Sequence, residues 1–159
     1  MATTTTTVDP GTLPQTMDRP SDSDAAFMAR MGLVWEAAVT GDTDDALPAF
    51  FPVTAYVQVK ELPDPIVDWH SRLVATYDRD LATLHAGIPA GAVLVSVVVP
   101  GAAARWIVPG VEYNRIGYWR VYGTEVTYSV AGVLHEFEIQ SLISWRGQWY
   151  VVHLVTPPR

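Results

Sequence analysis

The chain has no cysteine among its 159 residues. Disulfide scaffolds, thiol catalysis, iron–sulfur clusters and cysteine-ligated zinc are therefore excluded. Lysine is almost absent as well, because Lys60 stands beside nine arginines. No apolar run approaches the roughly 18 residues that a membrane-spanning helix needs. The longest such run, residues 92–99, instead indicates a buried strand.

Positive charge is also scarce. The formal net charge is −7, and the first 50 residues hold eight acidic side chains against two basic ones. A protein that binds nucleic acid or an anionic membrane surface needs a cluster of basic side chains to meet the phosphates. The sequence contains no such cluster, so we expect neither partner.

Residues 1–20 are rich in threonine and proline and contain few aliphatic side chains. Such a composition cannot build a core, so we expect a flexible tail or linker there and a single domain over residues 21–159. The tail is either a frayed terminus or a linker left after removal of an anchor. The first alternative fits a cytoplasmic protein, and the second an exported and tethered one. The compartment stays open.

Apolar residues make up 49% of the chain, which is enough for a folded core. Apolar positions recur at helical spacing before Gly41 and again from Pro65 to Ala86, where Asp64 and Pro65 form a typical helix start. A short helix is expected after Asp45. Weak alternation predicts a short strand over residues 53–60.

From Gly91 onward the apolar period is two, which predicts antiparallel strands over 92–99, 112–122, 124–131, 133–145 and 148–155. A glycine-containing turn at Gly123 is expected to separate the second strand from the third. The two-residue turns that follow fix the pairing, placing Tyr128 opposite His135 and Ser141 opposite Val152. The face of Tyr128 is expected to cover the helices. The opposite, outer face is expected to carry Arg120, Glu125, Thr127, Glu136, Glu138, Gln140 and His153.

The predicted fold class is α+β, with N-terminal helices packed on a curved antiparallel β-sheet. In this order of elements, and in the closing hairpin with Trp145 and Trp149 in a W-x-x-x-W pattern, the chain resembles the NTF2-like superfamily over about residues 25–154. The cystatin-like layout is the alternative. The resemblance implies a cone-shaped domain with an internal pocket. Members include isomerases, dehydratases, cyclases and epoxide hydrolases, and also binding and assembly modules, so the fold leaves the activity open.

Polar and aromatic side chains on faces expected to be buried are the candidate site. A desolvated histidine or aspartate can act as a general base, and a tyrosine can stabilise an oxyanion. The same residues can instead line a binding pocket without chemistry, or simply be satisfied within the core. The catalytic candidates are His70, Asp80, Tyr128 and His135, and the ligand-binding candidates are Trp69, Tyr77, Trp119 and Phe137.

The sequence shows no metal-ligand pattern, phosphate-binding loop or dinucleotide fingerprint, so we predict neither a metal nor a cofactor. The preferred function is a binding or assembly module with a small, mostly apolar pocket between helix 65–86 and the sheet, holding a small apolar ligand. One alternative is a cofactor-free isomerase, dehydratase or hydrolase. The other is a tethered accessory domain of a cell-envelope complex. A homodimer through the sheet face is expected, because apolar side chains at one end of that face would otherwise be bare. Coverage by the N-terminal third or by the tail is the alternative.

Overall fold

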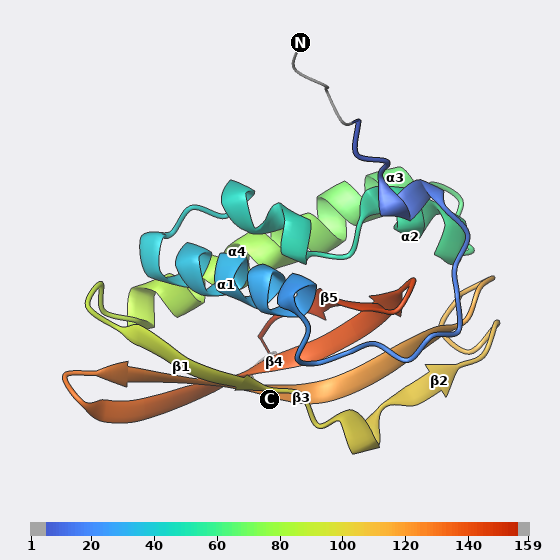
Figure 1. Cartoon of the computed structure of the whole chain (residues 1–159). Helices are drawn as coiled ribbons and strands as arrows, with labels where there is room; N and C mark the ends of the chain where they lie inside the picture. Colours follow the sequence, from blue (N-terminus) through green and yellow to red (C-terminus); the bar gives the residue numbers. More distant parts are fainter. Residues whose placement is uncertain (1–5, 156–159) are drawn as a thin grey trace, which may run out of the picture.

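The computed structural model describes residues 6–155 and has two layers, with helices covering one side of a curved antiparallel sheet (Figure 1). The strand order is β1-β3-β4-β5, and β2 pairs with β3 beside β1. This confirms the α+β class. The strands are β1 (Val93–Val98), β2 (Arg105–Ile107), β3 (Tyr118–Val130), β4 (Val133–Trp145) and β5 (Gln148–His153), and the α-helices are α1 (Ala25–Thr40), α2 (Val53–Val59), α3 (Pro65–Asp68) and α4 (Ala75–Gly87).

Helix α1 ends at Gly41, as its sequence predicts, and its N-cap is Asp24. The Asp24 carboxylate accepts a hydrogen bond from the Phe27 amide at 2.8 Å, which caps the first turn. Gly41 ends the helix with a φ of 80°, a left-handed conformation that costs glycine little. The buried face of α1 carries Phe27, Met31, Val34, Ala37 and Ala38.

Helix α2 replaces the strand expected over residues 53–60, so that prediction was wrong. Valine and threonine favour strands only weakly, and packing overrides the preference. Ala55, Tyr56 and Val59 are buried at helical spacing, and Pro52 stands at the N-cap. The final turn of α2 consequently delivers Tyr56 and Lys60 to the same part of the molecule.

The long helix expected over residues 65–86 is present, but a π-helical segment, Trp69–Val74, joins α3 to α4. Its buried stripe is narrower than expected and consists of Trp69, Leu73, Tyr77 and Leu81. The neighbouring Ile66 is exposed. These buried positions are four residues apart, so they form a single row along one face of the helix.

Strand β3 runs without a break through Gly123, where two strands and a turn were expected. Gly123 adopts a φ of 79° inside the strand. Pairing with β4 is continuous, and it sets Tyr128 opposite His135 as predicted. Because there is no hairpin at Gly123, Arg120 pairs with Ile143 instead of joining the expected outer face.

A β-bulge in β5 changes the expected pairing of Ser141. Ser141 pairs with His153, and the next residue, Leu142, pairs with Val151, so Val152 is the extra residue. The predicted pair of Ser141 and Val152 was therefore wrong. Residues directly opposite each other in a ladder share a face. The bulge thus moves His153 from the expected outer face to the face of Ser141.

The described part of the segment before α1 forms hydrogen bonds with the end of the sheet. The Gln15 side chain donates to the Ser144 carbonyl at 3.1 Å and accepts from the Arg146 amide at 2.7 Å. The Trp145 indole donates to the Pro10 carbonyl at 2.7 Å. Polar side chains thus anchor a stretch that has too few apolar ones to pack; residues 1–5 lie outside the described part.

Within residues 6–155, the helices are all too short or too polar to cross a bilayer.

Candidate functional site

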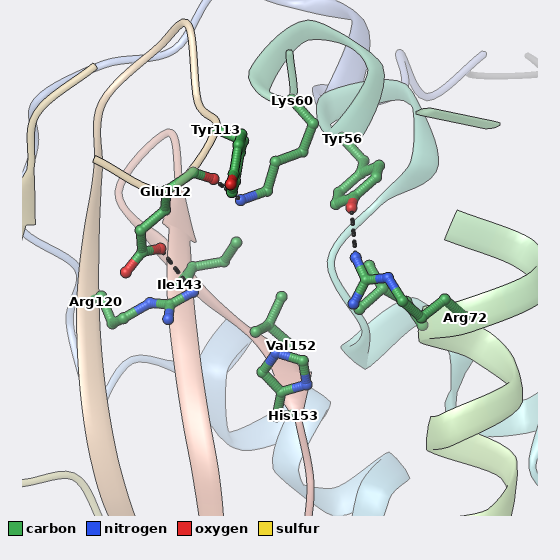
Figure 2. Close-up of a pocket in the computed structure, with 10 residues that line it drawn as sticks. Tyr56, Lys60, Arg72, Glu112, Tyr113, Arg120, Ile143, Val152 and His153 are labelled. Atoms are coloured by element: carbon green, nitrogen blue, oxygen red, sulfur yellow. Dashed lines mark hydrogen bonds and ion pairs between the residues drawn. The ribbon is translucent and has the colours of Figure 1, made fainter. Parts of the chain in front are cut away.

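A cavity of about 320 Å³ opens between the helical layer and one end of the sheet (Figure 2). Helix α2, the π-helical segment, the loop before β3 and strands β3, β4 and β5 all contribute to its wall. The lining mixes charged, aromatic and aliphatic side chains: Tyr56, Lys60, Arg72, Leu73, Glu112, Tyr113, Arg120, Ile143, Val152 and His153.

The helical wall is built around a salt bridge between two residues that lie one turn apart on the long helix. Arg72 donates from Nε to Asp68 Oδ1 at 2.8 Å and from a terminal nitrogen to Asp68 Oδ2 at 2.7 Å. The Tyr56 hydroxyl donates to the same Oδ2 at 2.6 Å and accepts from Arg72 at 3.1 Å. Hydrogen bonding by Arg72 lowers the pKa of Asp68. The charge of Arg72 is therefore compensated in place.

The sheet wall contains a second compensated cation. Arg120, whose side chain is 12% exposed, lies 3.0 Å from Glu112 Oε2 and donates to the Tyr122 hydroxyl at 2.8 Å. The Tyr118 hydroxyl also donates to Glu112, and burial raises the pKa of Tyr118. Arg120 Nε is buried without a hydrogen-bond partner among the described residues. This wall therefore keeps one unused donor.

The loop that carries Glu112 is fixed by a buried asparagine. Asn114 is 1% exposed, accepts from the Glu112 amide at 2.9 Å, and donates to the Val108 and Ile116 carbonyls. It also forms an isolated β-bridge with Lys60. The loop and the end of α2 are thus held together, and the cavity rim between them is built of backbone contacts.

Lys60 is the uncompensated cation of the cavity. Its ammonium donates to the Glu112 carbonyl at 2.9 Å and lies 3.4 Å from the Tyr118 hydroxyl. In residues 6–155 the ion pairs are Arg72–Asp68 and Arg120–Glu112, and Lys60 belongs to neither. Burial lowers the pKa of Lys60, and Arg120 and Arg72 add to this while Glu112 opposes it. The cavity therefore carries an excess positive charge inside an acidic protein.

His153 faces these cations from β5. Val152 and His153 both line the cavity, which is the consequence of the bulge described above (Figure 2). Burial lowers the pKa of His153, and Arg120, Arg72 and Lys60 lower it further. Its imidazole is therefore neutral at pH 7.

The candidates that the sequence placed on the long helix lie outside this cavity. Trp69 is buried and donates to the Phe51 carbonyl at 2.8 Å. Tyr77 packs against Phe50 in the core. Asp80 accepts from the Val155 amide at 3.2 Å. His70 is exposed beside Trp69, because the helix face it occupies turns to solvent.

The sheet candidates form a separate group near the β3–β4 turn. His135 is exposed and stacks on Tyr128 with ring centroids 5.4 Å apart, and Phe137 lies beside Tyr128 at 6.3 Å. Trp119 contacts the N-terminal segment, donating to the Met17 carbonyl at 3.0 Å. The proposed convergence of His135 and Tyr128 with the residues of the long helix is therefore not found, because Tyr128 packs against Trp35 of α1, with ring centroids 5.3 Å apart, and His135 is exposed.

The sequence pattern did not identify the residues that meet in the cavity, for three local reasons. Lys60 and Tyr56 were assigned to a strand, Glu112 was assigned to another, and His153 was placed on the wrong face. One signal was available, because Lys60 is the chain's single lysine. In the part of the chain that the structure describes, no group of three or more histidine, aspartate or glutamate side chains is arranged to hold a metal ion.

Comparison of the chain with models of protein families, with curated proteins and with solved structures found no match in any of the three.

Proposed function

We propose that the protein is a binding module that holds a small organic acid in the cavity next to Lys60. The observation that carries this proposal is the half-buried Lys60 ammonium, which contacts a carbonyl and a phenol but no carboxylate among the described residues. A buried charge is costly unless it is paired. A ligand carboxylate would supply the missing partner.

The net positive charge of the cavity favours a negatively charged ligand. Asp68 compensates Arg72 and Glu112 compensates Arg120, which leaves the charge of Lys60 unmatched. This balance favours a ligand with a single negative charge. Arg120 Nε is a further donor without a partner in residues 6–155.

The body of the ligand would contact the aliphatic part of the wall, formed by Leu73, Ile143 and Val152. Such mixed lining is typical of small-molecule sites, where a few polar groups fix the orientation. The sequence predicted a mostly apolar pocket and an apolar ligand. Because the wall also carries charged side chains, we instead propose an amphipathic acid as the ligand.

Element order and the hairpin of Trp145 and Trp149 support the resemblance to the NTF2-like superfamily, whose members include pocket-based binding modules. The proposed site does not depend on that assignment, since it rests on side chains whose contacts are given above.

Calorimetry with matched pairs of acids and amides tests the function. Cyclohexanecarboxylate and benzoate should bind at least about tenfold more tightly than cyclohexanecarboxamide and benzamide, because a charged hydrogen bond is worth about 1.5–3 kcal/mol. Lys60→Gln should remove most of this preference. The exposed Arg105 supplies the control, since Arg105→Gln removes a positive charge outside the cavity lining. Equal affinity for acid and amide, or equal losses in the two variants, would contradict the proposal.

A further inference from the structure

The contacts of Lys60 are unusual for a lysine that is to stay charged. Its nitrogen touches the Glu112 carbonyl and approaches the Tyr118 hydroxyl, both neutral groups, and it belongs to neither ion pair of residues 6–155. The guanidinium groups of Arg72 and Arg120 line the same cavity. Partial burial and these two cations disfavour the ammonium form, whereas the Glu112 carboxylate of the same cavity favours it.

A lysine in this setting becomes a nucleophile. Desolvation and neighbouring cations are the two ways in which proteins activate a lysine amine toward carbonyl compounds. Burial has the largest effect and lowers the pKa of Lys60; the Glu112 carboxylate opposes it, and Arg120 and Arg72 lower the pKa further. The amine also faces an open cavity, so a bound molecule has access to it (Figure 2).

We propose that Lys60 forms a reversible imine with an aldehyde or ketone group of the bound acid. This inference rests on the binding function proposed above and names the ligand class more narrowly, as a small aldehydo or keto acid. In a 2-oxo acid the carboxylate and the carbonyl group are on neighbouring carbons, so the carboxylate pairs with the protonated Lys60 and the carbonyl lies within reach of the same nitrogen once it has lost a proton.

The reaction balances without any further reactant. The Lys60 nitrogen lone pair attacks the carbonyl carbon, a C–N bond forms, and the C=O π electrons move to oxygen. That oxygen takes a proton, and the nitrogen loses one, which gives a carbinolamine. The hydroxyl then leaves as water while C=N forms, so an amine and a carbonyl compound give an imine and water. The Tyr118 hydroxyl lies 3.4 Å from the Lys60 nitrogen and is hydrogen-bonded to Glu112. It is therefore placed to relay protons between Lys60 and Glu112.

The composition of the chain makes the test unusually clean, because Lys60 is the only side-chain amine. Its single competitor is the α-amino group of the polypeptide. At pH 7 the deprotonated fraction of an ordinary lysine, with a pKa near 10.4, is about a hundredfold or more below that of an α-amine with a pKa near 8. Ordinary chemistry would therefore label the α-amine first.

The experiment treats the wild-type chain with glyoxylate, pyruvate or 2-oxobutanoate at pH 7, reduces the imine with borohydride, and maps the adduct by peptide mass spectrometry. Labelling of Lys60 should exceed that of the α-amine at least about tenfold, the reverse of the ordinary order. Butanone, which lacks the carboxylate, should label Lys60 several-fold less. Lys60→Arg should abolish the internal adduct, and the wild-type map decides the matter even if that variant does not fold.

Binding is followed in parallel by NMR shifts with the same acids. Labelling confined to the α-amine, while the acids still shift cavity resonances, would overturn the imine and leave the binding function standing. If Lys60 is not labelled and the acids cause no NMR shifts, the imine and the binding function are both overturned. Labelling of Lys60 about a hundredfold weaker than that of the α-amine would show that Lys60 carries only the reactivity of an ordinary lysine, and would also overturn the inference.

Discussion

His153 lies on the cavity wall with Arg120, Arg72 and Lys60, so a proton on its imidazole would meet three like charges. Burial removes water that would stabilise the charged ring. The neutral ring keeps both a donor and an acceptor nitrogen, whereas the cations around it only donate. A bound ligand therefore finds at His153 a ring nitrogen that can accept a hydrogen bond.

The pH dependence of stability tests the state of His153. Its folded pKa lies below 6.5, so in the unfolded chain the ring takes up a proton at a higher pH than in the folded protein. The contribution of the neutral ring is complete above pH 6.5 and is lost as the pH falls toward the folded pKa. Urea unfolding at pH 8 and pH 5 should therefore show a smaller loss of stability in His153→Gln than in the wild type. Equal losses would contradict this assignment, and NMR titration of the ring gives the pKa directly.

At the scale of elements, the caps and the regular strands were readable from the sequence because local chemistry decides them. Asp64 and Gly41 act at helix ends through hydrogen bonds and backbone freedom that depend on near neighbours. The pairing of Tyr128 with His135 followed from a two-residue turn. The fold class followed from the same local signals.

The irregular elements were not readable, because tertiary packing decides them. The bulge at Val152 and the π-helical segment each alter which residues face inward, yet both leave the period of the sequence nearly unchanged. Helix α2 has strand-like residues that are helical only because one of their faces is buried. The cavity is bordered by all three irregularities, which is why its residues were missed.

The cap of α1 offers an element-scale prediction with a matched control. Asp24→Ala should lower the free energy of unfolding by about 1 kcal/mol, because the Phe27 amide loses its acceptor. Asp24→Asn keeps an acceptor oxygen and should cost much less. Hydrogen bonding by Phe27 lowers the pKa of Asp24 below its ordinary 3.8, so the stabilisation holds above that pH and fades as the pH falls through the folded value. Equilibrium urea unfolding of the three proteins measures both effects, and equal losses in the two variants would refute the capping role.

At the scale of the whole molecule, the N-terminal segment ties distant parts of the chain together. Gln15 and Pro10 hydrogen-bond residues more than a hundred positions away, at the turn between β4 and β5. The expected homodimer stays a prediction, and Val93, Val95 and Leu134 are exposed aliphatic side chains on the sheet that such a contact would bury.

The contrast between a positive cavity and a chain of net charge −7 has a kinetic consequence. An approaching acid is repelled at long range and attracted only once it has reached the mouth of the cavity. Dissolved salt screens the distant repulsion more strongly than the partly buried attraction. Stopped-flow mixing with benzoate should therefore show association that quickens as sodium chloride is raised, opposite to the behaviour of proteins that steer their ligands inward; a slowing would mean that the local field at the mouth outweighs the charge of the whole.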